Sequence, residues 1–156
     1  MTTGPNDSAG AAVETAPELV ITRIFDAPRS LVFKAWTQPE HLVRWLGPTD
    51  FSASAVRIDL QPGGAWSAVI TSPDGKSHGM GGVYREIAPP ERLVFTFAWD
   101  EEDAQRTLIA LTFRERDGKT EMTFRQTGFR SVESRDSHRG GWSQCFDRLP
   151  PYLAQI

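Results

Sequence analysis

The feature that most constrains the fold is a helical pattern at the end of the sequence, in residues 136–156. Its apolar side chains recur every three or four residues, which places them in one stripe along an α-helix: Trp142, Cys145, Phe146, Leu149, Tyr152, Leu153 and Ile156. Most of residues 19–127 carries the two-residue alternation of β-strands instead. Because the helix must bury its stripe and the sheet needs cover on one face, we expect the helix to lie on the sheet, with any pocket between the two.

The segment before that helix predicts one strand, two short helices and six further strands. The first short helix opens near Pro28 and buries Trp36. A capping box, in which Thr37 and Glu40 satisfy each other's backbone donors, starts the second helix, and Gly47-Pro48 ends it. Turn signals such as Asp74-Gly75 separate the strands. The strands are expected at residues 19–25, 56–60, 66–71, 83–87, 93–99, 107–114 and 120–127.

Length and composition describe a single globular domain of 156 residues. A net charge of -3 with scattered basic residues argues against a nucleic-acid partner. The single cysteine, Cys145, excludes an intrachain disulfide, and its place on the apolar stripe predicts a buried structural thiol and a reducing, cytoplasmic location. We expect residues 1–17 to be a disordered tail and residues 18–156 to form the domain, without a signal peptide or membrane insertion.

Several short motifs follow one another in a characteristic order between Leu19 and Leu153. They are Ala27-Pro28, Trp36, Pro39-Glu40-His41-Leu42, Trp45, Gly47-Pro48, Pro62-Gly63-Gly64, Pro89-Pro90-Glu91-Arg92-Leu93, His138-Arg139-Gly140-Gly141-Trp142, Asp147-Arg148-Leu149 and Tyr152-Leu153. Together these motifs resemble the activator of heat-shock protein 90 ATPase homologue family, part of the START-like, SRPBCC superfamily. The resemblance implies an α+β helix-grip (Bet v 1-like) fold, with a curved antiparallel sheet of about seven strands around a long C-terminal helix and two short helices after the first strand.

Two consecutive prolines, Pro150 and Pro151, depart from the family's pattern within that helix. Each removes a backbone donor, and each can cost about 3 kcal/mol or more in a helix interior. We therefore expect a kink or stop near Leu149. The position of Tyr152 and Leu153 then stays open, as does the question of whether the prolines open or seal the end of the pocket.

The charged and polar residues predict neither a metal centre nor a cofactor. His41, His78 and His138 are far apart and lack metal-ligand spacing. The glycines of residues 79–82 fit a bent or closely approached strand, and the acidic residues 100–103 fit a water-facing hairpin tip. Asp147 and Arg148 fit an exposed pair opposite the apolar stripe better than a catalytic pair.

The candidate ligand contacts are mostly large rings, which can fill a core or line a cavity equally well. Gly140 and Gly141 remove side-chain bulk before Trp142 and favour some space over the sheet. Arg23 and two of the candidates, Tyr84 and Gln126, are possible polar contacts, although for Arg23 we favour a pairing with a carboxylate. The candidates are Trp36, Trp45, Phe51, Trp66, Met80, Tyr84, Phe97, Trp99, Gln126, Trp142 and Phe146.

Three functions are compatible with this sequence. The first, which the helix-grip resemblance implies, is binding of a small hydrophobic or aromatic molecule, including a lipid, in an apolar cavity. The second is a cyclase, hydratase or lyase activity on a cavity-bound substrate, for which no convincing acid–base pair is visible. The third, suggested by the family's name, is a co-chaperone in the stress response with a chaperone or another protein as partner. In the eukaryotic activators that this family resembles, a separate chaperone-binding domain precedes this one, whereas only a short tail precedes residue 19 here. We therefore favour ligand binding over activation of a chaperone ATPase.

Overall fold

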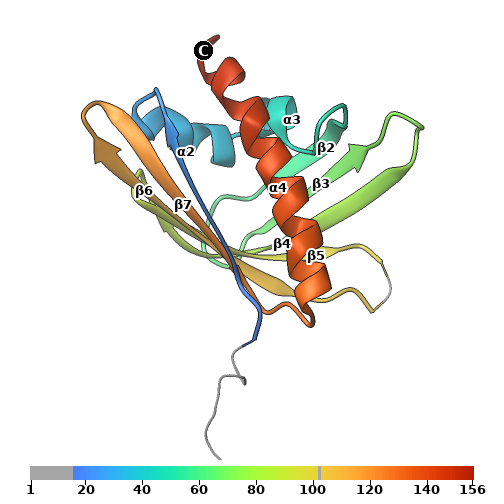
Figure 1. Ribbon diagram of the computed structural model, residues 1–156. Helices are drawn as coiled ribbons and strands as arrows, with labels where there is room; N and C mark the ends of the chain where they lie inside the picture. Colours follow the sequence, from blue (N-terminus) through green and yellow to red (C-terminus); the bar gives the residue numbers. More distant parts are fainter. Residues whose placement is uncertain (1–15, 102) are drawn as a thin grey trace, which may run out of the picture.

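A computed structural model describes residues 16–101 and 103–156, so most of the expected disordered tail lies outside the described residues (Figure 1). The element order is one strand, two helices, six strands and a final helix, as predicted. The elements are β1 (Leu19–Phe25), α2 (Arg29–Thr37), α3 (Pro39–Trp45), β2 (Ser52–Ile58), β3 (Ala65–Thr71), β4 (Ser77–Ala88), β5 (Arg92–Trp99), β6 (Thr107–Arg116), β7 (Lys119–Thr127) and α4 (Val132–Leu153).

The seven strands form one antiparallel sheet in the order β1-β7-β6-β5-β4-β3-β2. Figure 1 shows this sheet curving around α4, with α2 and α3 beside one end of the helix. Register shifts between Ser54 and Arg57 and between Tyr84 and Glu86 supply local bends. The predicted helix-grip architecture is confirmed, and the cover that α4 and the sheet provide for each other follows from their apolar faces.

Strand β4 shows why its glycines are needed. A Cβ atom on Gly82 would lie 1.9 Å from the carbonyl oxygen of Thr96, and one on Gly81 would lie 2.7 Å from that of Trp66. The predicted close approach of neighbouring backbones is therefore confirmed at these two positions. The strand itself is longer than predicted, because it begins at Ser77 and not at residue 83.

The phase predicted for the second strand is confirmed at Val56 and Ile58, which pack against the core, but the predicted bounds of the strand are wrong. Strand β2 stops at Ile58, and Leu60 beyond it is 41% exposed. Ala55 has a φ of 52° within the register shift, so the alternation that starts at Ser52 is interrupted before Arg57. A bulge adds one residue to one strand of the pair and changes which side chains face inward.

The predicted capping box between α2 and α3 does not form. Thr37 is the last residue of α2, and its hydroxyl donates to the carbonyl of Phe33 at 2.9 Å. Gln38 takes the N-cap position of α3 without a side-chain hydrogen bond, and Pro39 occupies the first helical turn. The hydroxyl of a Thr inside a helix commonly bonds to the carbonyl four residues earlier, and here that bond replaces the cap.

Helix α4 is longer than the sequence pattern predicts at its start. It begins at Val132, where the Ser131 hydroxyl accepts a hydrogen bond from the backbone N–H of Ser134 at 3.0 Å. This is the usual N-cap arrangement, and it satisfies one of the free donors of the first turn.

The stop expected near Leu149 is also wrong, because α4 continues through Pro150 and Pro151 to Leu153. Both prolines are exposed, whereas Tyr152 and Leu153 are buried. The Tyr152 hydroxyl lies 2.5 Å from Nδ1 of His41 on α3, which ties the last turn to the rest of the protein. Ile156 lies beyond the helix and is 44% exposed, so it does not belong to the buried stripe.

Arg23 on β1 pairs with a carboxylate, as favoured from the sequence. Its Nη1 donates to Oδ1 of Asp147 at 2.9 Å, and its Nη2 donates to the carbonyl of Ser143 at 3.2 Å. Both partners lie on α4, so the guanidinium links the edge strand to the helix. Within the described residues, no helix is long and apolar enough to cross a membrane.

Candidate ligand cavity

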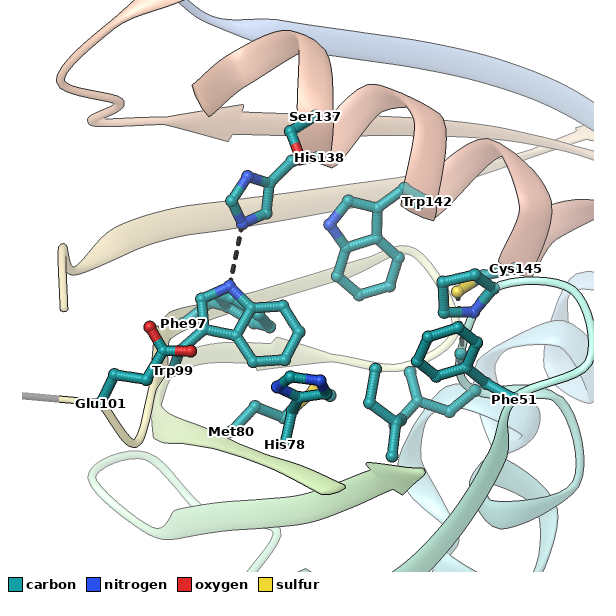
Figure 2. A pocket seen from close by; sticks show the side chains of 15 residues that line it. Phe51, His78, Met80, Phe97, Trp99, Glu101, Ser137, His138, Trp142 and Cys145 are labelled. Atoms are coloured by element: carbon teal, nitrogen blue, oxygen red, sulfur yellow. Dashed lines mark hydrogen bonds between the residues drawn. The ribbon is translucent and has the colours of Figure 1, made fainter. Parts of the chain in front are cut away.

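A cavity of about 350 Å³ lies between α4 and the strands β3, β4 and β5 (Figure 2). This volume is within the range of about 300 to 1,000 Å³ that is usual for small-molecule sites. The wall is largely apolar and is completed by the loop between α3 and β2. The lining residues are Leu46, Gly47, Pro48, Phe51, Ile70, His78, Met80, Phe97, Trp99, Glu101, Ser137, His138, Gly141, Trp142 and Cys145.

Strand register places the floor of the cavity. Phe97 and Trp99 are two residues apart on β5 and so share its inner face. Met80 on β4 lies opposite Trp99, and His78 on β4 lies opposite Ile70 on β3. The alternation of three adjacent strands therefore brings these five side chains to one patch of the curved sheet.

Helix α4 provides the opposite wall through residues one turn apart. His138, Trp142 and Cys145 have the three- and four-residue spacing of one helix face. Gly141 lies on the same wall, where an added Cβ would come only within 3.9 Å of the Pro48 ring. Gly140 does not line the cavity, and an added Cβ there would meet nothing within 4 Å. Of the two glycines, it is therefore Gly141 whose missing side chain leaves room for the cavity between α4 and the sheet.

The structure divides the eleven predicted ligand contacts into two groups. Five of them line the cavity, namely Phe51, Met80, Phe97, Trp99 and Trp142. The other six lie away from it, because they are packed or hydrogen-bonded in the interior; they are Trp36, Trp45, Trp66, Tyr84, Gln126 and Phe146.

The contacts of these six side chains explain their position. The Trp36 and Trp45 rings meet edge to face at 4.9 Å, and the Trp45 indole N–H donates to the carbonyl of Ala35 at 3.1 Å. The Trp66 indole N–H donates to the carbonyl of Thr96 at 3.0 Å. Gln126 donates to the Thr107 hydroxyl at 2.8 Å. These bonds satisfy the indoles of Trp45 and Trp66 and the amide nitrogen of Gln126 within the core, whereas the Trp36 indole N–H and the Gln126 side-chain oxygen are buried without a hydrogen-bond partner among the described residues.

A small interior void of about 20 Å³ lies next to this packed region. Trp36, Trp66 and Tyr84 line it together with Trp142, which also lines the main cavity. Burial raises the pKa of the Tyr84 phenol, so that hydroxyl stays protonated well above its ordinary range. Neither Arg23, which is held by Asp147, nor Tyr84 nor Gln126 provides a polar contact in the main cavity.

Arg148 has a role that the sequence did not predict. It is half-buried and not an exposed partner of Asp147, which is 67% exposed and bonds to Arg23. The Arg148 Nη1 donates to the carbonyl oxygens of Leu46, Gly47 and Pro48, with the shortest distance, 2.9 Å, to Gly47. These carbonyls follow the end of α3, so the guanidinium holds the loop that forms one wall of the cavity.

Cys145 is the buried structural thiol that was predicted. Its Sγ accepts a hydrogen bond from the backbone N–H of Gly47 at 3.2 Å. Burial raises the pKa of this thiol from 9.0 to about 12, because the thiolate would lose its hydration. The thiol is therefore protonated at neutral pH and serves as an apolar part of the wall.

His138 connects α4 with β5 at one end of the cavity. The Trp99 indole N–H donates to its Nε2 at 3.1 Å (Figure 2), and its Nδ1 lies 2.8 Å from the carbonyl of Ser134. Since an indole can only donate and a carbonyl can only accept, the ring must be the neutral tautomer with a proton on Nδ1. Both nitrogens of His138 are thus already hydrogen-bonded within the protein.

Among the lining residues that were not predicted as ligand contacts, His138 has a signal in the sequence, because it is one helical turn before Trp142 and this spacing indicates a shared face. Glu101 is exposed, as expected for a water-facing tip, and it also lines the cavity. No group of three or more potential metal-binding side chains occurs within the described ranges.

Fold and cavity together define a START-like helix-grip protein with an open apolar cavity. The chain belongs to the family of Activator of Hsp90 ATPase homolog 1-like proteins, whose sequence profile matches residues 26–154. A search of curated proteins gave no significant match.

Solved bacterial structures share this fold. The chain superposes on a protein from Chromobacterium violaceum with a TM-score of 0.82 at 24% identity, covering 87% of this chain and 96% of that one. An Arthrobacter aurescens protein gives 0.81 at 24% identity, with coverages of 96% and 92%. The AHSA1 protein from Silicibacter pomeroyi gives 0.80 at 21% identity, with coverages of 89% and 99%. At these identities the likeness concerns the fold.

Proposed function

We propose that this protein binds a small hydrophobic or aromatic molecule in the cavity between α4 and the sheet. The observation that carries the proposal is the open apolar cavity of about 350 Å³, which has aromatic rings on both walls. Phe97 and Trp99 supply one wall and Trp142 supplies the other, with the Phe97 and Trp142 ring centroids 6.0 Å apart. Concave sites with apolar walls and a few polar groups are the usual sites of small-molecule binding.

The test is a titration of the isotope-labelled protein with largely apolar compounds, followed by two-dimensional amide NMR. Flavonoids, sterols and polyketide-like aromatics form the panel, together with fatty acids. Binding should shift the amide signals of the Trp142 region of α4 and of the Phe97 region of β5. A bound compound should also stabilise the fold, by about 2.7 kcal/mol when its free concentration is a hundredfold above the dissociation constant. Absence of any shift across the panel would contradict the proposal.

Two adjacent glycines provide a matched pair of variants for this test. Gly141→Leu places a side chain into the cavity, whereas Gly140→Leu places the same side chain where nothing lies within 4 Å of its Cβ. Both changes raise helix propensity in the same way. We expect Gly141→Leu to abolish binding and Gly140→Leu to preserve it. Equal binding by the two variants would place the ligand elsewhere.

A co-chaperone role is a second candidate, and the description of the matching family favours it. It predicts that the protein raises the ATPase rate of a heat-shock protein 90 chaperone. The ATPase rate with and without the protein tests this role directly. The Gly141→Leu variant separates the two candidates, because a filled cavity should leave a chaperone contact made elsewhere unchanged.

A further inference from the structure

The most exposed polar side chains of the cavity lining lie at its mouth, whereas the imidazoles of His78 and His138 are half-buried in its wall. The deep part is lined by buried apolar side chains, among them Leu46, Ile70 and Met80. Glu101 and Ser137, in contrast, line the cavity but are exposed to solvent. Figure 2 shows the Glu101 carboxylate beside Trp99, at the opposite end of the cavity from Phe51 and Cys145. This lining suits a ligand with an apolar body inside and a polar end at the mouth.

The charge at the mouth is negative. Among the Asp, Glu, Lys and Arg residues of the described part of the chain, Glu101 is the one that lines the cavity, together with the imidazoles of His78 and His138. No ion pair among the described residues neutralises Glu101. A carboxylate on the ligand would be repelled here, whereas a cation would be attracted.

The rings at this end also favour a cation. Trp99 lies 5.3 Å from Phe97 and 6.2 Å from the His138 ring, measured between ring centroids. The Trp99 N–H is already bonded to His138, so the indole has no donor left for an anionic group. What it still presents is a ring surface, and indole faces attract ammonium groups.

We propose that the ligand of this cavity is an amine-bearing aromatic amphiphile, with its apolar body against Phe97 and Trp142 and its protonated amine at the mouth beside Glu101 and Trp99. This inference rests on the proposed ligand-binding function and specifies its ligand class. Fatty acids and other ligands that end in a carboxylate are disfavoured by the same geometry.

The test compares three probes that share one ring system and differ in the charge of the end group. Naphthylethylamine is cationic, naphthylethanol is neutral and naphthylacetate is anionic at neutral pH. Their dissociation constants are measured by amide NMR titration at constant salt. We expect the amine to bind about three- to tenfold more tightly than the alcohol, and the acetate to bind more weakly than the alcohol.

Two charge-matched variants locate the effect. Glu101→Gln should bring the dissociation constants of amine and alcohol to within about twofold of each other, because the attracting charge is lost. Asp103→Asn removes the same charge from the same turn but outside the cavity lining, and Asn tolerates the positive φ of 63° at that position. It should therefore preserve the preference for the amine.

The outcomes separate this inference from the function on which it rests. If naphthylethanol binds in the cavity and the amine binds no more tightly, or if the preference persists in Glu101→Gln, the amine assignment is overturned while ligand binding stands. If none of the three probes binds but another neutral compound does, the assignment is likewise overturned. If no compound binds at all, the proposed function itself fails.

Discussion

The aromatic residues of this protein behave differently at the two ends of α4. At the packed end, Trp36, Trp45 and Phe146 are buried against one another, with the Trp45 ring 0% exposed. At the cavity end, Phe51 and Trp99 are half-buried and border open space. The residue types are the same, so the difference comes from what covers them. Helices α2 and α3 lie beside the packed end (Figure 1), whereas the loop after α3 forms part of the cavity wall.

Trp142 belongs to both ends and marks the boundary between them. Its ring is 4.9 Å from that of Phe124 and stacks on Phe146 at 5.7 Å, yet it also lines the cavity. An aromatic side chain can therefore support the core with one part of its surface and a ligand site with another. If the two ends differ in this way, side chains at the packed end should contribute more to the free energy of unfolding than side chains at the cavity end.

The largest effect is expected at the packed end. Trp45→Ala should destabilise the fold by about 3 to 5 kcal/mol, because it leaves a cavity among fully buried rings and removes a buried hydrogen bond to Ala35. Chemical denaturation of the variant and the parent protein measures this loss. A loss below about 1 kcal/mol would show that the packed end is not packed in solution.

Alkaline pH should act on Cys145, a buried residue of the cavity wall. Because the pKa of the Cys145 thiol is raised from 9.0 to about 12 in the folded state, its contribution to stability is fully present below about pH 9 and is lost as the pH rises toward 12. The unfolding free energy should fall by roughly 2 to 3 kcal/mol by about pH 11 from this group. Urea denaturation across this pH range measures the loss, and Cys145→Ala should remove this part of it. An unchanged pH profile in the variant would contradict the assignment.

A smaller loss is expected at the cavity end. Trp99→Ala removes a half-buried ring and its hydrogen bond to His138, and should cost about 1 to 2 kcal/mol. It should also weaken ligand binding, whereas a ligand should still bind to a Trp45→Ala protein that remains folded. Paired denaturation and NMR titrations measure both properties. If Trp99→Ala costs as much stability as Trp45→Ala, the two regions do not differ in the way described.

The smallest effect is a gain. Gly140→Ala should stabilise the protein by about 0.5 to 1 kcal/mol, because alanine is a better helix former and its methyl group meets nothing within 4 Å. Ligand affinity should stay the same, since Gly140 does not line the cavity. Thermal unfolding detects the gain, and a destabilised variant would mean that this face of α4 is covered in solution.

Much of the fold could be predicted because its signals are local. The alternation in residues 19–25 depends only on neighbouring residues, and β1 occupies this range. The misassigned features have two different causes. At Thr37 two local hydrogen bonds compete, and the bond to the Phe33 carbonyl four residues earlier replaces the capping box. Helix α4 passes Pro150 because Tyr152 and Leu153 are anchored in the core, and a local pattern contains no information about those distant contacts.

The sequence by itself determined the order of the elements, the inward faces of the strands and the stripe that brings α4 onto the sheet, since these follow from the period of apolar residues. Only the tertiary structure decided which rings fill the core and which line the cavity. Trp45 and Trp99 are the same residue type. Trp45 is buried against Trp36 and Phe146, whereas Trp99 borders the open cavity. The same is true of Glu101, which became a cavity residue only when the curved sheet brought the end of β5 opposite α4.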